Sequence, residues 1–239
     1  MKRVRIGIIV PSLNTIAEDD FRAYCPPDVA YHVHRIRLRK EAGRVTMDSL
    51  TRAWLEAIDE AGFLKDLSPD AIAFNCTGAS VAHGKGCDTA LAVRMSEQLG
   101  VPSVNTMTAI KQALGFLRAS SILHVCPFSD EFSRVERESL QEAGLQVQRT
   151  VSLGFTDAKV AAQMEPREIT ETVLKQVDDA TGAVLLSCAN VRAFEAAHEL
   201  ETTLGMPVVT SNQAMLWSVL QAAGWRGSIA GAGRLLAGN

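Results

Sequence analysis

Short apolar runs alternate with longer amphipathic segments along most of this chain. Apolar runs of this length are typical of buried strands, and apolar positions at helical spacing are typical of helices. Strands are predicted at 5–10, 71–76, 102–106, 122–126, 147–153, 183–188 and 207–211. Helices are predicted from about 15, over 47–63, from 77 to about 99, over 130–143 and 166–178, from 189 to about 204, and over 213–223. This alternation indicates an α/β fold with parallel sheets.

The second half of the chain repeats the order of the first. Pro11 after the first strand corresponds to Pro127, and Cys76 corresponds to Cys188. The sequence GVP at 100–102 corresponds to GMP at 205–207. The offset between the copies shrinks slowly along the chain, as loop deletions would make it. We therefore predict two similar α/β domains, one formed by 1–115 with 214–239 and the other by 116–213.

Cys76 and Cys188 are the main candidates for chemistry, because each ends an apolar run, AIAFNC and AVLLSC. Parallel sheets bind ligands at the carboxyl ends of their strands. If the two halves face each other with those ends together, both thiols lie in one cleft, on opposite faces of a small substrate. A helix is predicted to start after each cysteine, and its free amides and dipole favour an anion there. A thiol in such a place can act as a nucleophile or as an acid and base.

The residues around the two cysteines point to a carboxylate ligand. Helix-start amides, together with Thr77, Ser80 and Asn190, could hold a substrate carboxylate. The same groups would stabilise an enediolate formed when a proton is removed or a nucleophile adds beside that carboxylate.

Other chemistry is not indicated. Cys25, Cys87 and Cys126 are expected to be buried and inert, as free cysteines commonly are. No CxxC or Cys/His spacing predicts a metal site or a disulfide framework. His83 is expected on a helix surface. The GAGRLLAG segment follows no strand and opens no helix, so it does not predict dinucleotide binding, and we expect no cofactor.

The charge pattern argues against nucleic-acid binding. The formal charge is −3, and the single basic stretch, HRIRLRK at 34–40, alternates as a strand with one solvated face would. No apolar run approaches the roughly 20 residues that cross a bilayer. The start MKRVRIGIIVPSLN is interpreted as a first core strand and not as a signal peptide. We therefore expect a cytoplasmic protein with reduced thiols and no membrane partner.

Four segments carry a resemblance to a known family: GIIVPSLNT at 7–15, NCTGAS at 75–80, SCANVRAF at 187–194 and PVVTSNQAMLW at 207–217. In them the chain resembles the aspartate/glutamate racemase superfamily, and within it the branch of maleate cis-trans isomerases and arylmalonate decarboxylases. The resemblance covers essentially the whole chain. It implies two Rossmann-like (flavodoxin-like) domains related by pseudo-twofold symmetry, with the active site between them. It also implies a homo-oligomer, a dimer or a tetramer.

The resemblance further implies roles for single residues. Cys76 would add as a thiolate to the double bond of a cis-dicarboxylate, giving an enediolate that permits rotation, and elimination would release the trans isomer. Cys188 would donate and accept the proton. The implied substrate-binding set is Asn14, Thr77, Gly78, Ser80, Phe128, Ala189 and Asn190.

Two positions depart from the pattern of this branch. Phe128 stands where a tyrosine is usual, and Ala158 lies where a polar asparagine is expected. Each change removes a contact to a substrate carboxylate. An isomerase of a small dicarboxylate is the leading hypothesis. The alternatives are a racemase or decarboxylase acting at a carbon next to a carboxylate, and a non-catalytic carboxylate-binding protein, which Phe128 supports.

Overall fold

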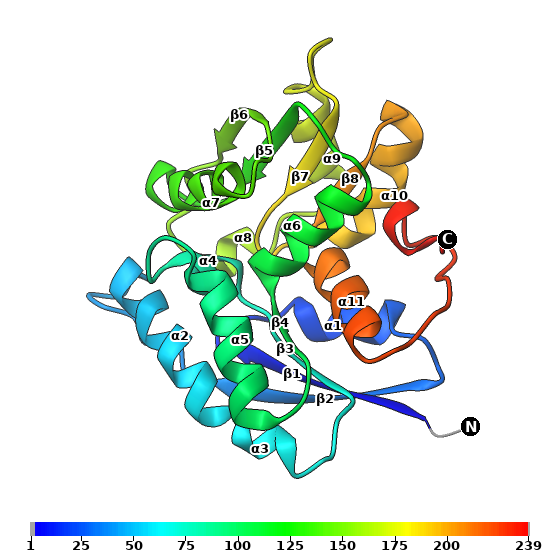
Figure 1. The fold of residues 1–239 in the computed structure, drawn as a ribbon. Coiled ribbons are helices and arrows are strands. Elements are labelled where there is room, and N and C mark those ends of the chain that lie inside the picture. The colour runs from blue at the N-terminus through cyan, green and yellow to red at the C-terminus, as the bar shows by residue number, and fades with distance from the viewer. Residues whose placement is uncertain (1–2, 239) are drawn as a thin grey trace.

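Two four-stranded parallel sheets form the framework of the computed structural model, which describes residues 3–238 (Figure 1). The strand order is β2-β1-β3-β4 in the first sheet and β6-β5-β7-β8 in the second. All neighbouring strands run parallel. The two halves therefore share one topology, and the predicted α/β class with two Rossmann-like sheets is confirmed.

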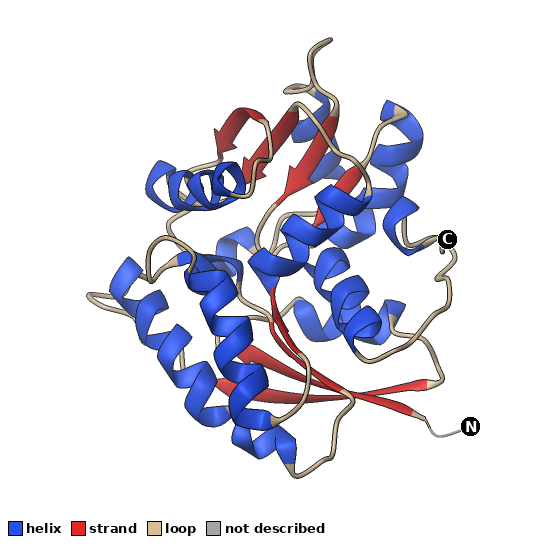
Figure 2. Ribbon diagram, viewed as in Figure 1, coloured by secondary structure: helices blue, strands red, loops and turns tan. Residues whose placement is uncertain are grey.

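Except for β2, of which only the alternation at 34–40 was noted, the strands lie close to their predicted positions. The first sheet contains β1 (Val4–Pro11), β2 (Val29–Ile36), β3 (Ala71–Phe74) and β4 (Ser103–Asn105). The second contains β5 (Ile122–Cys126), β6 (Val147–Ser152), β7 (Ala183–Leu186) and β8 (Val208–Thr210). The inner strands β3, β5 and β7 are buried along their whole length, because helices cover both faces of each sheet (Figure 2). Strands β3 and β7 end two residues before Cys76 and Cys188, so both thiols lie in the loops that follow.

Helices fill the connections. In the first half they are α1 (Ala17–Tyr24), α2 (Met47–Glu60), α3 (Gly62–Lys65), α4 (Thr77–Val81), α5 (Cys87–Leu99) and α6 (Thr106–Phe116). In the second half they are α7 (Asp130–Glu142), α8 (Ala158–Ala161), α9 (Pro166–Leu174), α10 (Ala193–Leu204) and α11 (Ser211–Ala222), followed by a 3₁₀ turn, η1 (Arg234–Leu236). None of the helices in residues 3–238 is long and apolar enough to cross a membrane.

The last helix of each half packs on the sheet of the other half. Met107 of α6 is buried together with Leu185 and Val209 of the second sheet. Conversely, Met215 of α11 is buried together with Ile8 of the first sheet. The two helices also pack against each other between the sheets (Figure 1). This exchange joins the two halves through clusters of buried residues to which both contribute.

The structure differs from the sequence-based predictions in three places. The helix predicted from 77 to about 99 is broken into α4 and α5, because Gly84 and Gly86 adopt positive φ values of 93° and 68°. Helix α6 was not predicted. Of the basic stretch at 34–40, only the part up to Ile36 belongs to a strand, and the rest is a loop.

Candidate active site

A cavity of about 470 Å³ lies between the sheets, at the carboxyl ends of their strands. Both Cys76, after β3, and Cys188, after β7, line it. Of the other predicted site residues, Asn14, Thr77, Gly78, Phe128, Ala189 and Asn190 also line this cavity. Topologically equivalent loops of the two halves thus supply the two thiols, as the duplicated pattern predicts.

Cys76 has extended backbone, with φ −149° and ψ 105°, and directly precedes α4. Burial raises the pKa of its thiol to about 12, and the negative charge of Glu136 acts in the same direction. A hydrogen bond from the backbone of Ala79 lowers the pKa but does not offset burial. The helix-start N–H of Ala79 thus favours the thiolate, as expected, but burial outweighs its effect.

Cys188 is held differently. Its φ is +92°, a value that non-glycine residues rarely adopt, and the backbone N–H of Asn190 donates to its Sγ at 3.3 Å. Burial raises the pKa of this thiol well above its ordinary value, and the charges of Glu136 and Cys76 raise it further. Helix α10 begins only at Ala193, so no helix start lies at Cys188. Both thiols are consequently neutral near pH 7.

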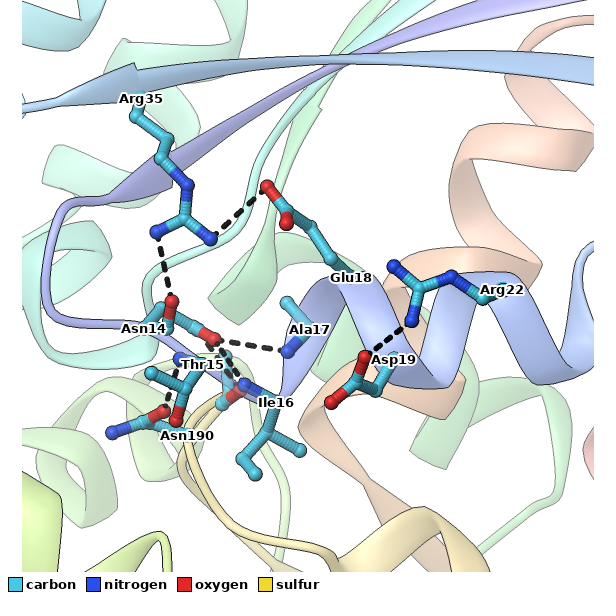
Figure 3. Close-up of polar contacts among 10 residues, drawn as sticks. Asn14, Thr15, Ile16, Ala17, Glu18, Asp19, Arg22, Arg35 and Asn190 are labelled. Atoms are coloured by element: carbon cyan, nitrogen blue, oxygen red, sulfur yellow. Dashed lines mark hydrogen bonds and ion pairs between the residues drawn. The ribbon is translucent and has the colours of Figure 1, made fainter.

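The side chain of Asn14 makes hydrogen bonds within the first half and to the second half (Figure 3). Its Oδ1 accepts hydrogen bonds from the backbone N–H groups of Ile16 and Ala17 at 3.0 and 2.9 Å, at the start of α1. Its Nδ2 donates to the carbonyl of Ala189 at 3.0 Å, across the interface between the halves. The carbonyl of Asn14 accepts from Arg35 at 2.9 Å. Asn14 therefore positions the loop beside Cys188, and the second N–H of its Nδ2 remains a donor in the cavity lining.

Asn190 makes the matching contacts from the second half. Its Oδ1 accepts from the backbone N–H of Thr15 at 2.8 Å, as Figure 3 shows, and its Nδ2 donates to the carbonyl of Ala158 at 3.0 Å. Ala158 itself lines the cavity with a methyl group only. Asn190 thus joins the two halves, and the predicted contact from Asn190 to substrate stays a prediction.

The residues that follow Cys76 divide into two kinds. Thr77 and Gly78 line the cavity, and the Thr77 hydroxyl lies 3.0 Å from that of Ser211. Ser80 is fully buried and does not line the cavity; its hydroxyl donates to the carbonyl of Cys76 at 2.8 Å. Ser80 therefore supports the Cys76 loop from behind.

Phe128 presents a ring to the cavity where a tyrosine hydroxyl would otherwise lie. Its ring packs edge-on against Phe132, with centroids 6.0 Å apart. Phe155 also lines this part of the cavity. This part of the cavity wall is apolar, because the side chains of Phe128, Phe132 and Phe155 carry no hydrogen-bonding group.

Sequence reasoning missed three charged residues of the cavity, Arg44, Glu131 and Glu136. Glu136 lies on the inward face of α7, and its Oε2 is 3.1 Å from Nε2 of His124, a fully buried residue of β5. The spacing of Glu136 with Leu140 on one helix face was the available signal. Arg44 lies in the β2–α2 connection and is exposed at the cavity mouth.

A second polar network runs behind the thiol loops. The side chain of Asn75 donates to that of Asn212 at 2.9 Å, and Asn212 donates to the carboxyl of Asp20 at 2.6 Å and to the carbonyl of Ala189 at 3.1 Å. Burial raises the pKa of Asp20 to about 7. This network links β3, α1 and the Cys188 loop.

The remaining candidates for chemistry lie elsewhere. Within residues 3–238, no group of three or more His, Cys, Asp or Glu side chains is placed to hold a metal ion. All five cysteines are free thiols, with Cys87 and Cys126 buried and Cys25 half-buried. His83 is exposed, in the turn after α4 and not on a helix, and it stacks on Trp54.

The fold and the thiol pair define a class of two-lobed α/β proteins with the active site between the lobes. Comparisons of this chain with known proteins lead to the same class. The sequence profile of the arylmalonate decarboxylase family matches residues 6–236. The chain belongs to the arylmalonate decarboxylase/maleate isomerase family, a branch of the Asp/Glu racemase superfamily, and is an enzyme of that family.

Three relatives illustrate the similarity. Maleate isomerase of Geobacillus stearothermophilus is 25% identical over 249 residues, covering 99% of this chain and 98% of the relative. Arylmalonate decarboxylase of Bordetella bronchiseptica is 26% identical over 222 residues, covering 92% and 90%. A solved serine variant of the Nocardia farcinica maleate cis-trans isomerase, with a covalently bound succinylcysteine intermediate, superposes with a TM-score of 0.89 at 21% identity and covers 98% of both chains.

Proposed function

We propose that this enzyme is a cofactor-independent cis-trans isomerase of a small unsaturated acid of the maleate type. The observation that carries the proposal is the placement of Cys76 and Cys188, which come from equivalent strand ends of the two sheets and line one cavity. Family membership alone leaves isomerisation and decarboxylation open. The presence of both thiols favours addition and proton transfer at one carbon–carbon double bond.

In the proposed reaction, Cys76 releases its proton to solvent water as substrate binds, and the sulfur of the resulting thiolate forms a C–S bond to one alkene carbon. The π electrons move onto the adjacent carboxylate as an enediolate, which loop amides near Thr77 and Ala189 would stabilise. The Cys188 thiol donates its proton to the neighbouring carbon. After rotation about the new single bond, the Cys188 thiolate takes a proton back, and the C–S bond breaks to release the trans isomer and the Cys76 thiolate.

The raised pKa of Cys188 fits its role as the proton donor. Burial keeps Cys188 protonated, as a proton donor must be. The addition step would give a thioether of the succinylcysteine kind found in the Nocardia farcinica relative. We assign the nucleophilic addition to Cys76 because its backbone has ordinary extended φ and ψ values. Cys188, in contrast, has φ +92° and accepts a hydrogen bond from the N–H of Asn190 on its sulfur.

A second candidate function is racemisation or decarboxylation at a carbon next to a carboxylate. The observation that favours it is that both thiols line one cavity, where one as a thiolate would remove a proton from a carbon and the other as a thiol would return one. No sulfur–carbon bond would then form.

The test is a substrate panel followed by proton NMR in D₂O. Maleate, its half-amide, both enantiomers of aspartate and glutamate, and an arylmalonate would be incubated with the wild type and with the Cys76→Ser, Cys188→Ser and Cys25→Ser variants. The proposal expects trans product from the wild type and the Cys25→Ser control, whose thiol lies outside the cavity. It expects at least about a 100-fold loss in each of the other two, as removal of a covalent or acid–base group produces. Deuterium exchange or loss of CO₂ without a trans product would refute it in favour of the second candidate.

A further inference from the structure

Glu136 is an acidic side chain in the cavity that the proposed reaction does not use. It lies on the inward face of α7, its side chain is 4% exposed, and it lines the same cavity as the two cysteines. Its charge raises the pKa of both Cys76 and Cys188, so its carboxylate acts at short range on the reacting groups. A ligand bound between the two thiols therefore shares the cavity with this carboxylate.

His124 fixes the orientation of Glu136. Nε2 of His124 lies 3.1 Å from Oε2 of Glu136 and 3.0 Å from Oγ of Ser187. Nδ1 of His124 is buried and has no hydrogen-bond partner. A buried N–H without an acceptor costs more than a bare ring nitrogen, so this network assigns the single hydrogen to Nε2. The Nε2–H of His124 then donates to Oε2 of Glu136, whose carboxyl oxygens accept hydrogen bonds.

The charges around the cavity complement one carboxylate and not two. Among the described residues that line it, Arg44 is the single cationic side chain, whereas Glu131 and Glu136 are both acidic. Phe128, where a hydroxyl would meet a carboxylate, offers no hydrogen bond. A second substrate carboxylate near α7 would face the buried like charge of Glu136, and like charges brought together in a desolvated site repel strongly.

We propose that Glu136, held by His124, is a specificity-determining residue that accepts a hydrogen bond from the far end of the substrate. The substrate class is then a cis-unsaturated monocarboxylate whose other end is a donor such as a carboxamide, that is, a half-amide of the diacid. This inference rests on the proposed isomerase function and names the substrate class of the same site.

The first measurement needs neither a variant nor turnover. Calorimetric affinities of the wild type for succinate and for its half-amide, both saturated and unreactive, compare a carboxylate with a carboxamide directly. We expect the half-amide to bind about 10- to 100-fold more tightly, the range that a hydrogen bond to a charged group provides. Equal affinity, or tighter binding of succinate, would overturn the inference.

The second measurement is the ratio of kcat/KM for the half-amide of maleate to that for maleate, in the wild type and in Glu136→Gln. The amide introduced by this substitution is uncharged and can donate, so the ratio should fall by about 10- to 100-fold. The matched control is Glu138→Gln on the same helix, an exposed residue paired with Arg134 outside the cavity, which should leave the ratio unchanged. A ratio that stays the same in Glu136→Gln would overturn the inference, with circular dichroism confirming that the variant is folded.

The two proposals fail in different ways. If the wild type isomerises neither acid, the proposed reaction is wrong, but the affinities for succinate and its half-amide still decide the role of Glu136. If maleate is isomerised and is preferred over its half-amide, the reaction stands and the assignment of Glu136 is wrong.

Discussion

The buried carboxyl of Asp20 predicts a stability that falls as the pH rises. Asp20 is 3% exposed, and burial raises its pKa from 3.8 to about 7, partly opposed by the hydrogen bond from Asn212. Between these two values the unfolded chain has released the proton and the folded chain retains it, so folding becomes less favourable with each pH unit. The contribution is fully present below about pH 4 and is lost as the pH passes 7.

The size of the effect follows from the shift. About three pKa units at 1.36 kcal/mol each give an upper value of about 4 kcal/mol between pH 4 and pH 8. In Asp20→Asn this titration is absent, while an amide oxygen can still accept the hydrogen bond from Asn212. The free energy of unfolding of the variant should therefore exceed that of the wild type increasingly as the pH rises.

Urea denaturation at half-unit steps from pH 4 to pH 8, at constant ionic strength, measures this difference. The matched control is Asp19→Asn, which removes an exposed carboxylate of the same helix; its surface ion pair with Arg22 contributes at most about 1 kcal/mol. A difference between Asp20→Asn and the wild type that stays constant over the whole range would refute the reasoning.

Three further predictions concern packing, backbone space and thiol reactivity. Phe194→Ala should lower the free energy of unfolding by about 3–5 kcal/mol in urea melts, because this buried ring stacks on Tyr24 with centroids 4.0 Å apart; a loss below about 1 kcal/mol would contradict it. Gly182→Ala should destabilise by at least about 1–3 kcal/mol, since its Cβ would lie 2.5 Å from the carbonyl oxygen of Ser120. Gly115→Ala, in open space within α6, should instead raise the melting temperature, and equal effects of the two glycine changes would be inconsistent with the structure. Alkylation of Cys76 by iodoacetamide, followed by peptide mass spectrometry, should accelerate about tenfold per pH unit up to about pH 10, because its pKa is about 12; a plateau near pH 8.5 would show an ordinary thiol.

The framework was largely predictable from the sequence because its inner strands are buried on both faces. Such strands appear as unbroken apolar runs between polar loops, and AIAF and AVLL fall where β3 and β7 lie. The duplication then placed Cys76 and Cys188 at equivalent strand ends. Their meeting in one cavity followed from topology and needed no knowledge of side-chain contacts.

Helix α6 was missed for a physical reason. Its apolar residues cover the second sheet, which comes later in the chain, so the segment resembled a continuation of the strand region before it. The capping box of Asn105 with Thr108 marks its start and is the local signal that identifies it.

The chemistry of the site was less predictable, because hydrogen-bond partners come from distant segments. Asn14 was assigned to substrate, and its amide also binds the start of α1 and the carbonyl of Ala189, 175 residues away, which the sequence did not indicate. Glu136 looked like one of many charges on an amphipathic helix. Its pairing with buried His124 depends on how α7 lies across β5, which no local pattern encodes.

The exchange of α6 and α11 between the sheets sets the order in which the chain can complete its cores during synthesis. The first sheet consists of strands that end with β4, but one of its faces is closed by Met215 and Leu220 of α11. A nascent chain that has emerged only as far as β8 therefore still exposes Ile6 and Ile8 on that face. The first half to be synthesised is the last to be closed, and a truncation before Ser211 would leave an open apolar sheet prone to aggregation.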